Sequence, residues 1–188
     1  MAETTLDQMT DRALGELGAV LKRIDAREVE TLVDLIAGAS RIATYGAGRE
    51  GLMMRALAMR LFHLGLDVHV VGDMTTPRLG PGDLFLVSTG PGYLSTAQAL
   101  IDTAKAAGAR AACFTAEPEG RTPQSVDHVV VLPAQTMARD QGAPSSFLPM
   151  GSLFEGAQFL FFEFLVLRLR DRLGETAETM RTRHTNLE

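Results

Sequence analysis

The sequence predicts a three-layer α/β domain built on a five-stranded parallel sheet. Five short apolar runs, typical of strands buried on both faces, alternate along the chain with longer segments of helical periodicity. The first two runs frame a glycine turn and a helix, and parallel strands need such a crossover helix. The 188 residues suffice for a single domain with a sizeable core, and they contain no linker or internal repeat.

Two amphipathic helices precede the first strand. Apolar side chains recur at helical spacing from Leu6 to Ile24 and again from Glu28 to Ala37. Asp25, between the two segments, is a plausible N-cap. We expect this N-terminal segment, residues 1–38, to pack on the sheet or on another subunit.

The first βαβ unit contains the first candidate site. A strand over residues 42–45 is followed by a helix and by a second strand over 68–71, and the turn after the first strand contains Gly46, Gly48 and Gly51. Glycines allow a sharp turn and leave the N–H groups of the following helix open to an anion. Ligands of parallel sheets collect at the carboxyl ends of the strands. The sequence therefore predicts a small-molecule anion site, for a phosphate or carboxylate, after the first strand.

Three further strands complete the predicted sheet. The apolar run over 83–89 ends in a second glycine turn, GPGYLST, which leads into a helix over 95–107. Gly108 is a natural end for that helix. The fourth and fifth strands are expected over 109–116 and 128–132.

The last part of the chain consists of a long loop and two helices. Residues 133–150 form an irregular segment with Gly142 and Pro144, and loops of this length in a compact domain are often functional. The helix expected over 152–173 is apolar on most faces and is therefore buried, in the core or in an interface. A last helix over 175–184 leads to the terminal TNLE.

Charge and composition exclude several classes of partner. The net charge of −5 and the pI of about 5.4 argue against nucleic acids and anionic membrane surfaces. The single cysteine, Cys113, cannot form an internal disulfide, and its apolar surroundings indicate a core residue in a reducing cytoplasm. The N-terminus lacks a signal-peptide pattern, and Glu155 and Glu163 interrupt the most apolar stretch. We expect a soluble, cytoplasmic protein.

Four segments carry a resemblance to a known family, which together with the order of the strands covers roughly residues 25–188. They are AMRLFHLG in the first crossover helix, VGDMTTP after the second strand, LPMGSLFE before the long late helix, and RHTNLE at the end. In them the chain resembles sugar isomerase (SIS) domains, and within these the 6-phospho-3-hexuloisomerase branch. The resemblance implies a flavodoxin-like fold, a homotetramer or dimer, and phosphosugar binding at the carboxyl ends of the strands. It also implies conversion of 3-hexulose 6-phosphate to fructose 6-phosphate without a metal or organic cofactor.

This isomerisation moves a proton between neighbouring carbons through an enediol, and one carboxylate can both remove and return it. The resemblance points to Glu155, in the first turn of the late helix, as that acid–base residue. A helix N-terminus favours the ionised carboxylate and weakens it as a base, so partial burial in a closed cleft would have to offset this effect. The alternative is that Glu155 only interacts with its own helix terminus.

His184 is the second catalytic candidate, as a proton shuttle between sugar oxygens or for ring opening. In a tetramer the terminal helix could carry it into the site of a neighbouring subunit. The alternative is a solvent-exposed histidine near a chain end. His63 is expected to be a packing residue near a subunit contact, and His69 and His128 are assigned no role. The four histidines show no metal-ligand spacing.

The candidates for substrate binding surround the two glycine turns. Hydroxyl groups and open helix N–H groups can hold a phosphate, and an arginine can meet a phosphate or a sugar hydroxyl. The alternatives are a surface arginine and ordinary N-capping by Ser95 or Thr96. The candidate residues are Gly48, Arg49, Glu50, Ser88, Thr89, Gly90, Ser95 and Thr96.

Both turns depart from the family pattern. Most SIS isomerases have a GRSG-like first turn and an SGSGET-like second turn, whereas here Glu50 replaces the first serine and the second turn reads STGPGYLST. A carboxylate ~4 Å from a phosphate would cost a few kcal/mol unless Glu50 turns away or pairs with Arg49 or Arg55. Two alternatives therefore stay open: an SIS isomerase for a different or non-phosphorylated sugar, and a non-catalytic sugar-phosphate-binding protein.

Overall fold

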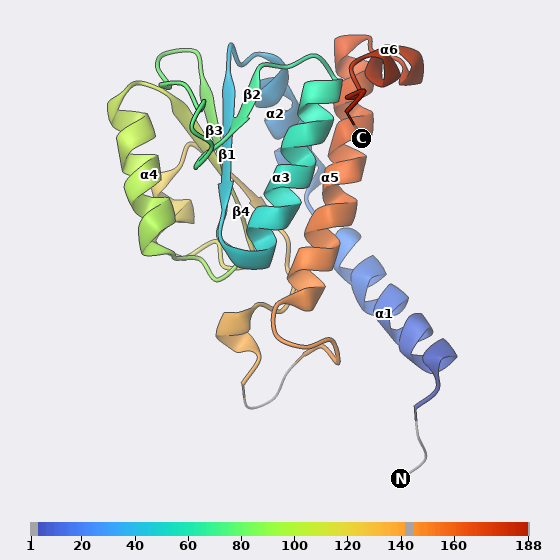
Figure 1. The fold of residues 1–188 in the computed structure, drawn as a ribbon. Helices are drawn as coiled ribbons and strands as arrows, with labels where there is room; N and C mark the ends of the chain where they lie inside the picture. The colour runs from blue at the N-terminus through green and yellow to red at the C-terminus, as the bar shows by residue number, and fades with distance from the viewer. Residues whose placement is uncertain (1–3, 142–144, 188) are drawn as a thin grey trace.

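The computed structural model describes residues 4–141 and 145–187, so Gly142 and Pro144 of the expected loop lie outside the described residues. A five-stranded, all-parallel sheet in the order β2-β1-β3-β4-β5 forms the centre, with helices on both faces (Figure 1). The predicted α/β sandwich is confirmed. The strands are β1 (Ile42–Gly46), β2 (Val68–Val70), β3 (Leu84–Ser88), β4 (Arg110–Thr115) and β5 (His128–Val131).

The helices are distributed unequally over the two faces of the sheet. One face packs against α2, α3 and α5, whereas α4 covers the other (Figure 1). The short helix α6 follows α5, and two 3-10 turns, η1 (Pro123–Ser125) and η2 (Met137–Arg139), lie in loops. The α-helices are α1 (Leu6–Leu21), α2 (Ala26–Ala37), α3 (Gly48–His63), α4 (Ser95–Ala106), α5 (Ser152–Leu173) and α6 (Ala177–Thr182).

The apolar runs of the central strands divide into two cores. All five residues of β3 are buried, with Leu84 and Leu86 facing α3 and α5 while Phe85 and Val87 face α4. This alternation explains the continuous apolar run, because a strand covered on both faces needs no polar side. Cys113 on β4 is 1% exposed, so the prediction of a core cysteine is confirmed.

The N-terminal helices pack mainly on α5. Asp25 caps α2 as predicted, because its Oδ1 accepts a hydrogen bond of 2.8 Å from the N–H of Arg27. Helix α2 contacts α5 and β5, and α1 runs beside the start of α5 and projects beyond the domain (Figure 1). No helix in the described part of the chain has both the length and the apolar composition needed to cross a membrane.

The C-terminal helix is shorter than predicted, at Ala177–Thr182. Thr176 caps it through a capping box, which delays its start. Arg183 then fixes the end of the chain to α3, since its guanidinium donates to the carbonyl oxygen of His63 (2.9 Å) and to the carboxylate of Glu175 (2.8 Å). The hydrogen bond from Arg183 lowers the pKa of Glu175 to about 2.

Candidate active site

Two glycine turns meet at the carboxyl edge of the sheet. We call residues 46–51, after β1, the first elbow, and residues 88–94, after β3, the second elbow. Strands β1 and β3 are neighbours, and Gly46 stands directly opposite Ser88 in their register. The two elbows therefore lie side by side, as the order of the strands predicts.

The first elbow needs its glycines for close backbone contact. Gly48 begins α3 with φ of +56°, and a Cβ added to Gly51 would lie 2.4 Å from the carbonyl oxygen of Gly46. Ala47 occupies the N-cap position of α3, and no side chain among the described residues caps that helix. The first N–H groups of α3 are thus available to a ligand.

The second elbow also leads into a helix without a side-chain cap. The N-cap residue of α4 is Leu94, and within the described ranges no side chain bonds to its first turn. The alternative of N-capping by Ser95 or Thr96 is therefore wrong. Both of these residues are exposed at the start of α4. The Thr89 hydroxyl, by contrast, is buried and lies 3.2 Å from the Cys113 sulfur.

Glu155 reaches both elbows from the first turn of α5. Its Oε2 accepts a hydrogen bond from Nε of Arg49, and its side chain is only 12% exposed. Together with Ala47 of the first elbow, Pro91 of the second and Phe154 of α5, it lines a pocket of about 230 Å³. The side chain thus does more than interact with its own helix terminus, while its catalytic role stays a prediction.

Glu50 points into the second elbow. The sequence left two ways to avoid repulsion, turning away or pairing with an arginine, and the structure shows neither. Arg49 pairs with Glu155, and Arg55 approaches Asp73 at 3.5 Å. Instead Oε2 of Glu50 accepts hydrogen bonds from the Ser88 hydroxyl (2.6 Å) and from the N–H of Gly90 (2.9 Å).

The surroundings of Glu50 change its acidity. Burial raises the pKa of the Glu50 carboxyl, the hydrogen bonds from Ser88 and Gly90 oppose that rise, and the nearby charge of Glu155 adds to it. The pocket therefore holds two carboxylates in different settings. Glu155 is paired with a cation, whereas Glu50 is held by neutral donors.

His184 lies away from this pocket within its own chain. Its imidazole stacks on that of His63, with ring centroids 5.2 Å apart and an interplanar angle of 28°. His63 ends α3, thirteen residues after Glu50, which is about 20 Å along the helix. Figure 1 shows α6 at that same end of α3. Any role of His184 in catalysis requires a neighbouring copy of the chain and stays a prediction. His63 is buried, as expected of a packing residue.

Sequence reasoning did not single out every lining residue. Thr136 and Met137, at the start of η2, line the pocket together with the first elbow. The length of the loop over 133–150 indicated a functional segment but not which residues face the ligand. In the described part of the chain, no cluster of three His, Cys, Asp or Glu side chains could hold a metal ion.

Comparisons with known proteins identify relatives over nearly the whole length. The profile of the SIS domain family matches residues 35–157. A 3-hexulose-6-phosphate isomerase of Mycobacterium gastri is 42% identical over 173 residues, which cover 92% of this chain and 86% of the relative. One of Bacillus subtilis is 36% identical over 93% of this chain and 95% of its own length. A solved structure of a hypothetical protein of Methanococcus jannaschii, whose description infers a 3-hexulose-6-phosphate isomerase function, superposes with a TM-score of 0.83 at 26% identity, covering 96% of this chain and 99% of that one.

Proposed function

Because the chain belongs to the SIS domain family, we propose that it converts 3-hexulose 6-phosphate to fructose 6-phosphate. The main support is the sequence similarity to isomerases of this activity, which extends over nearly the full length of this chain and of each relative. The pocket at the two elbows supports it, because it brings a carboxylate, a guanidinium and open helix N–H groups together.

In this mechanism Glu155 is the acid–base residue. Its carboxylate takes the proton from C2 of the substrate, and the C–H electron pair becomes the C2–C3 double bond of the enediol. The same group then returns the proton to C3, while a hydroxyl proton passes from O2 to O3 and the carbonyl forms at C2. Arg49 orients Glu155 and supplies positive charge beside the oxygens on which negative charge develops.

The phosphate of the substrate would bind at the second elbow. A smaller pocket of about 110 Å³ adjoins the first and shares Ala47, Glu50 and Pro91 with it. Ser95 and Thr96 begin the uncapped helix α4 beside this second pocket, where hydroxyl and N–H donors suit an anion. The reacting carbons would then lie next to Glu155 in the larger pocket.

The assembly and the role of His184 belong to the same proposal. Helices α1 and α5 expose a set of large apolar side chains, which a homotetramer or dimer would cover. His184 would serve as a proton shuttle in the site of a neighbouring subunit. The exposed apolar residues are Leu6, Met9 and Leu14 on α1 and Phe159, Phe164 and Leu167 on α5.

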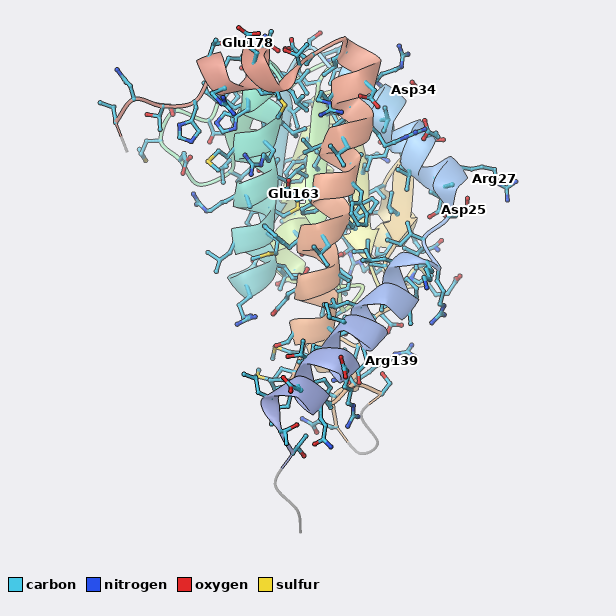
Figure 2. All side chains as sticks on the ribbon, turned by 90° about the vertical axis from the view of Figure 1, so that its right-hand side faces the viewer. Asp25, Arg27, Asp34, Arg139, Glu163 and Glu178 are labelled. Atoms are coloured by element: carbon cyan, nitrogen blue, oxygen red, sulfur yellow. The ribbon has the colours of Figure 1, made fainter. Side chains whose placement is uncertain are left out.

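Replacing Glu155 tests the mechanism. Glu155→Gln is expected to lower kcat by about 10²–10⁴-fold, because the amide cannot take a proton, while the affinity for fructose 6-phosphate changes little. A coupled assay measures turnover, and calorimetry measures binding. Glu163→Gln is the matched control: Glu163 lies midway along the same helix (Figure 2), where its carboxylate approaches Arg60 of α3 at 3.3 Å.

Three outcomes distinguish the proposed catalytic role of Glu155 from its alternatives. Loss of turnover in Glu155→Gln but not in Glu163→Gln supports the assigned role. Near-normal turnover in Glu155→Gln contradicts it. If the unmodified protein isomerises no sugar phosphate but is thermally stabilised by one, the chain is a binding protein and not an enzyme.

A further inference from the structure

The carboxylate of Glu50 occupies the place where the second elbow offers its donors. Its Oε2 takes the Ser88 hydroxyl and the Gly90 N–H, which are both groups suited to an anionic ligand. Its Oε1 lies against Gly90, since a Cβ added to that glycine would stand 2.8 Å from this oxygen. A phosphate cannot occupy these donors while Glu50 holds them.

Glu50 also stands between the two pockets. It lines both the 230 Å³ pocket beside Glu155 and the 110 Å³ pocket beside the start of α4. A substrate that spans the two pockets must pass this side chain. The charge and position of this side chain therefore bear directly on the affinity for the anionic end of the substrate.

We propose that Glu50 is an internal competitor of the substrate's phosphate. The carboxylate keeps the donors of Ser88 and Gly90 engaged in the empty site, and the phosphate binds them only when Glu50 releases them. The inference rests on the proposed function, because it concerns how that site takes a phosphosugar. In this proposal Glu50 controls the affinity for the phosphate of the substrate and takes no part in the reaction itself.

The charges around Glu50 set the sign of a pH effect. Arg49 of α3 and Glu155 of α5 line the larger pocket with Glu50, Tyr93 of the second elbow lines the smaller one with it, and the charge of Glu50 also acts on the thiol of Cys113 on β4. Burial raises the pKa of the Cys113 thiol to about 12, so that group is neutral across the working range. The pKa of Glu50 is itself raised by burial, so protonation begins at a higher pH than for an exposed glutamate.

Two variants of Glu50 test the proposal through phosphate binding alone. Inorganic phosphate and fructose 6-phosphate are titrated by calorimetry at fixed ionic strength into the full-length chain. Glu50→Ala frees both donors and is expected to tighten binding at least 10-fold. Glu50→Gln keeps the size of the side chain but removes the charge, and a smaller gain is expected. Glu117→Gln is the control: this carboxylate is close to the second elbow, where it bonds to Arg139 outside both pockets.

The pH dependence gives a second readout. A phosphate monoester loses its second proton with a pKa of about 6 and thereby gains a second negative charge, so the alanine variant reports the ligand's own titration. The ratio of dissociation constants, unmodified protein over Glu50→Ala, is expected to be largest at high pH. It should fall as the pH is lowered toward the raised pKa of Glu50, because protonation removes the competing charge.

Equal or weaker phosphate binding in both variants would overturn the proposal, and so would a ratio that does not change with pH. Weaker binding of fructose 6-phosphate in both variants would mean that Glu50 holds the sugar instead. If the alanine variant does not fold, the glutamine variant decides. These measurements need no turnover, so a failure of the isomerase assignment is recognised separately, in the coupled assay.

Discussion

At the scale of single residues, Gln158 is buried without satisfying its amide. The residue is 0% exposed on α5, and neither its nitrogen nor its oxygen has a hydrogen-bond partner among the described residues. An unpaired buried amide costs about 1–3 kcal/mol. Gln158→Met preserves the volume and removes the polar atoms, so the free energy of unfolding should rise by about 1–3 kcal/mol.

Denaturant unfolding measures this change, and Gln98→Met provides the contrast. The amide nitrogen of Gln98 donates to Asp102 and to Ser125, each at 3.0 Å, and only its oxygen lacks a partner among the described residues, so its replacement should destabilise the protein. A loss of stability in Gln158→Met would contradict the expectation and indicate that a buried water satisfies the amide.

The neighbouring residues Arg49 and Glu50 show what sequence can and cannot predict at this scale. The replacement of a serine by Glu50 signalled a problem with phosphate binding. How the carboxylate affects the site depends on the direction in which its side chain points. Consecutive helical residues point about 100° apart, so Arg49 reaches α5 while Glu50 reaches the second elbow. The phase of α3 relative to its neighbours is a tertiary property that no local pattern of residues contains.

At the scale of elements, the first elbow depends on the absence of a side chain at Gly51. A Cβ there would lie 2.4 Å from the backbone oxygen of Gly46, and backbone cannot move aside as a flexible side chain can. Gly51→Ala should therefore destabilise the protein by about 1–3 kcal/mol. It should also lower turnover, because Arg49 and Glu50 immediately precede it.

Thermal unfolding and the coupled assay measure both effects, with Gly15→Ala as the control. Gly15 lies within α1, and a Cβ there would meet nothing within 4 Å. Alanine at that position should stabilise the protein by about 0.5–1 kcal/mol. Equal behaviour of the two variants would show that the close approach in the first elbow is not required.

The elements were predictable because their signals are local. Apolar runs, glycine turns and the cap at Asp25 each mark a strand, a turn or a helix start with few residues. The start of α4 at Ser95 was predicted correctly, but the alternative of a hydroxyl N-cap was wrong, because Leu94 and not Ser95 or Thr96 occupies the N-cap position. The second elbow fixes where the helix begins, and Gly92, with φ of +82°, is part of that turn.

At the scale of the whole molecule, the sequence predicted the sheet but not the completed site. Alternating strands and helices suffice for a parallel sheet, and the order of its strands brings the two elbows together, whereas the packing of α5 on α3 brings Glu155 to them. The position of His184 relative to the site could not be predicted from the order of the strands. Its stacking on His63 leaves it at the far end of α3, so the predicted catalytic role of His184 requires a neighbouring copy of the chain.

The exposed apolar side chains of α1 and α5 lead to a prediction about assembly. The protein should elute with two or four times the mass of the chain in size-exclusion chromatography with light scattering. A double variant, Leu14→Glu with Phe164→Glu, should elute as a monomer, because these side chains are 62% and 50% exposed in the single chain. Met74→Glu is the control, since Met74 is 99% exposed in the loop after β2. An unmodified protein that elutes as a monomer would contradict the prediction.

Assembly also allows the shared site to be tested directly. If Glu155 of one subunit works with His184 of another, then mixing Glu155→Gln chains with His184→Ala chains before reassembly creates some sites with both residues intact. Random mixing in a symmetric oligomer would restore about a quarter of the unmodified activity, although each variant alone is nearly inactive. Normal turnover in His184→Ala alone, with mixed oligomers showing only the roughly half activity that these chains supply, would remove His184 from the mechanism and leave Glu155 as its acid–base residue.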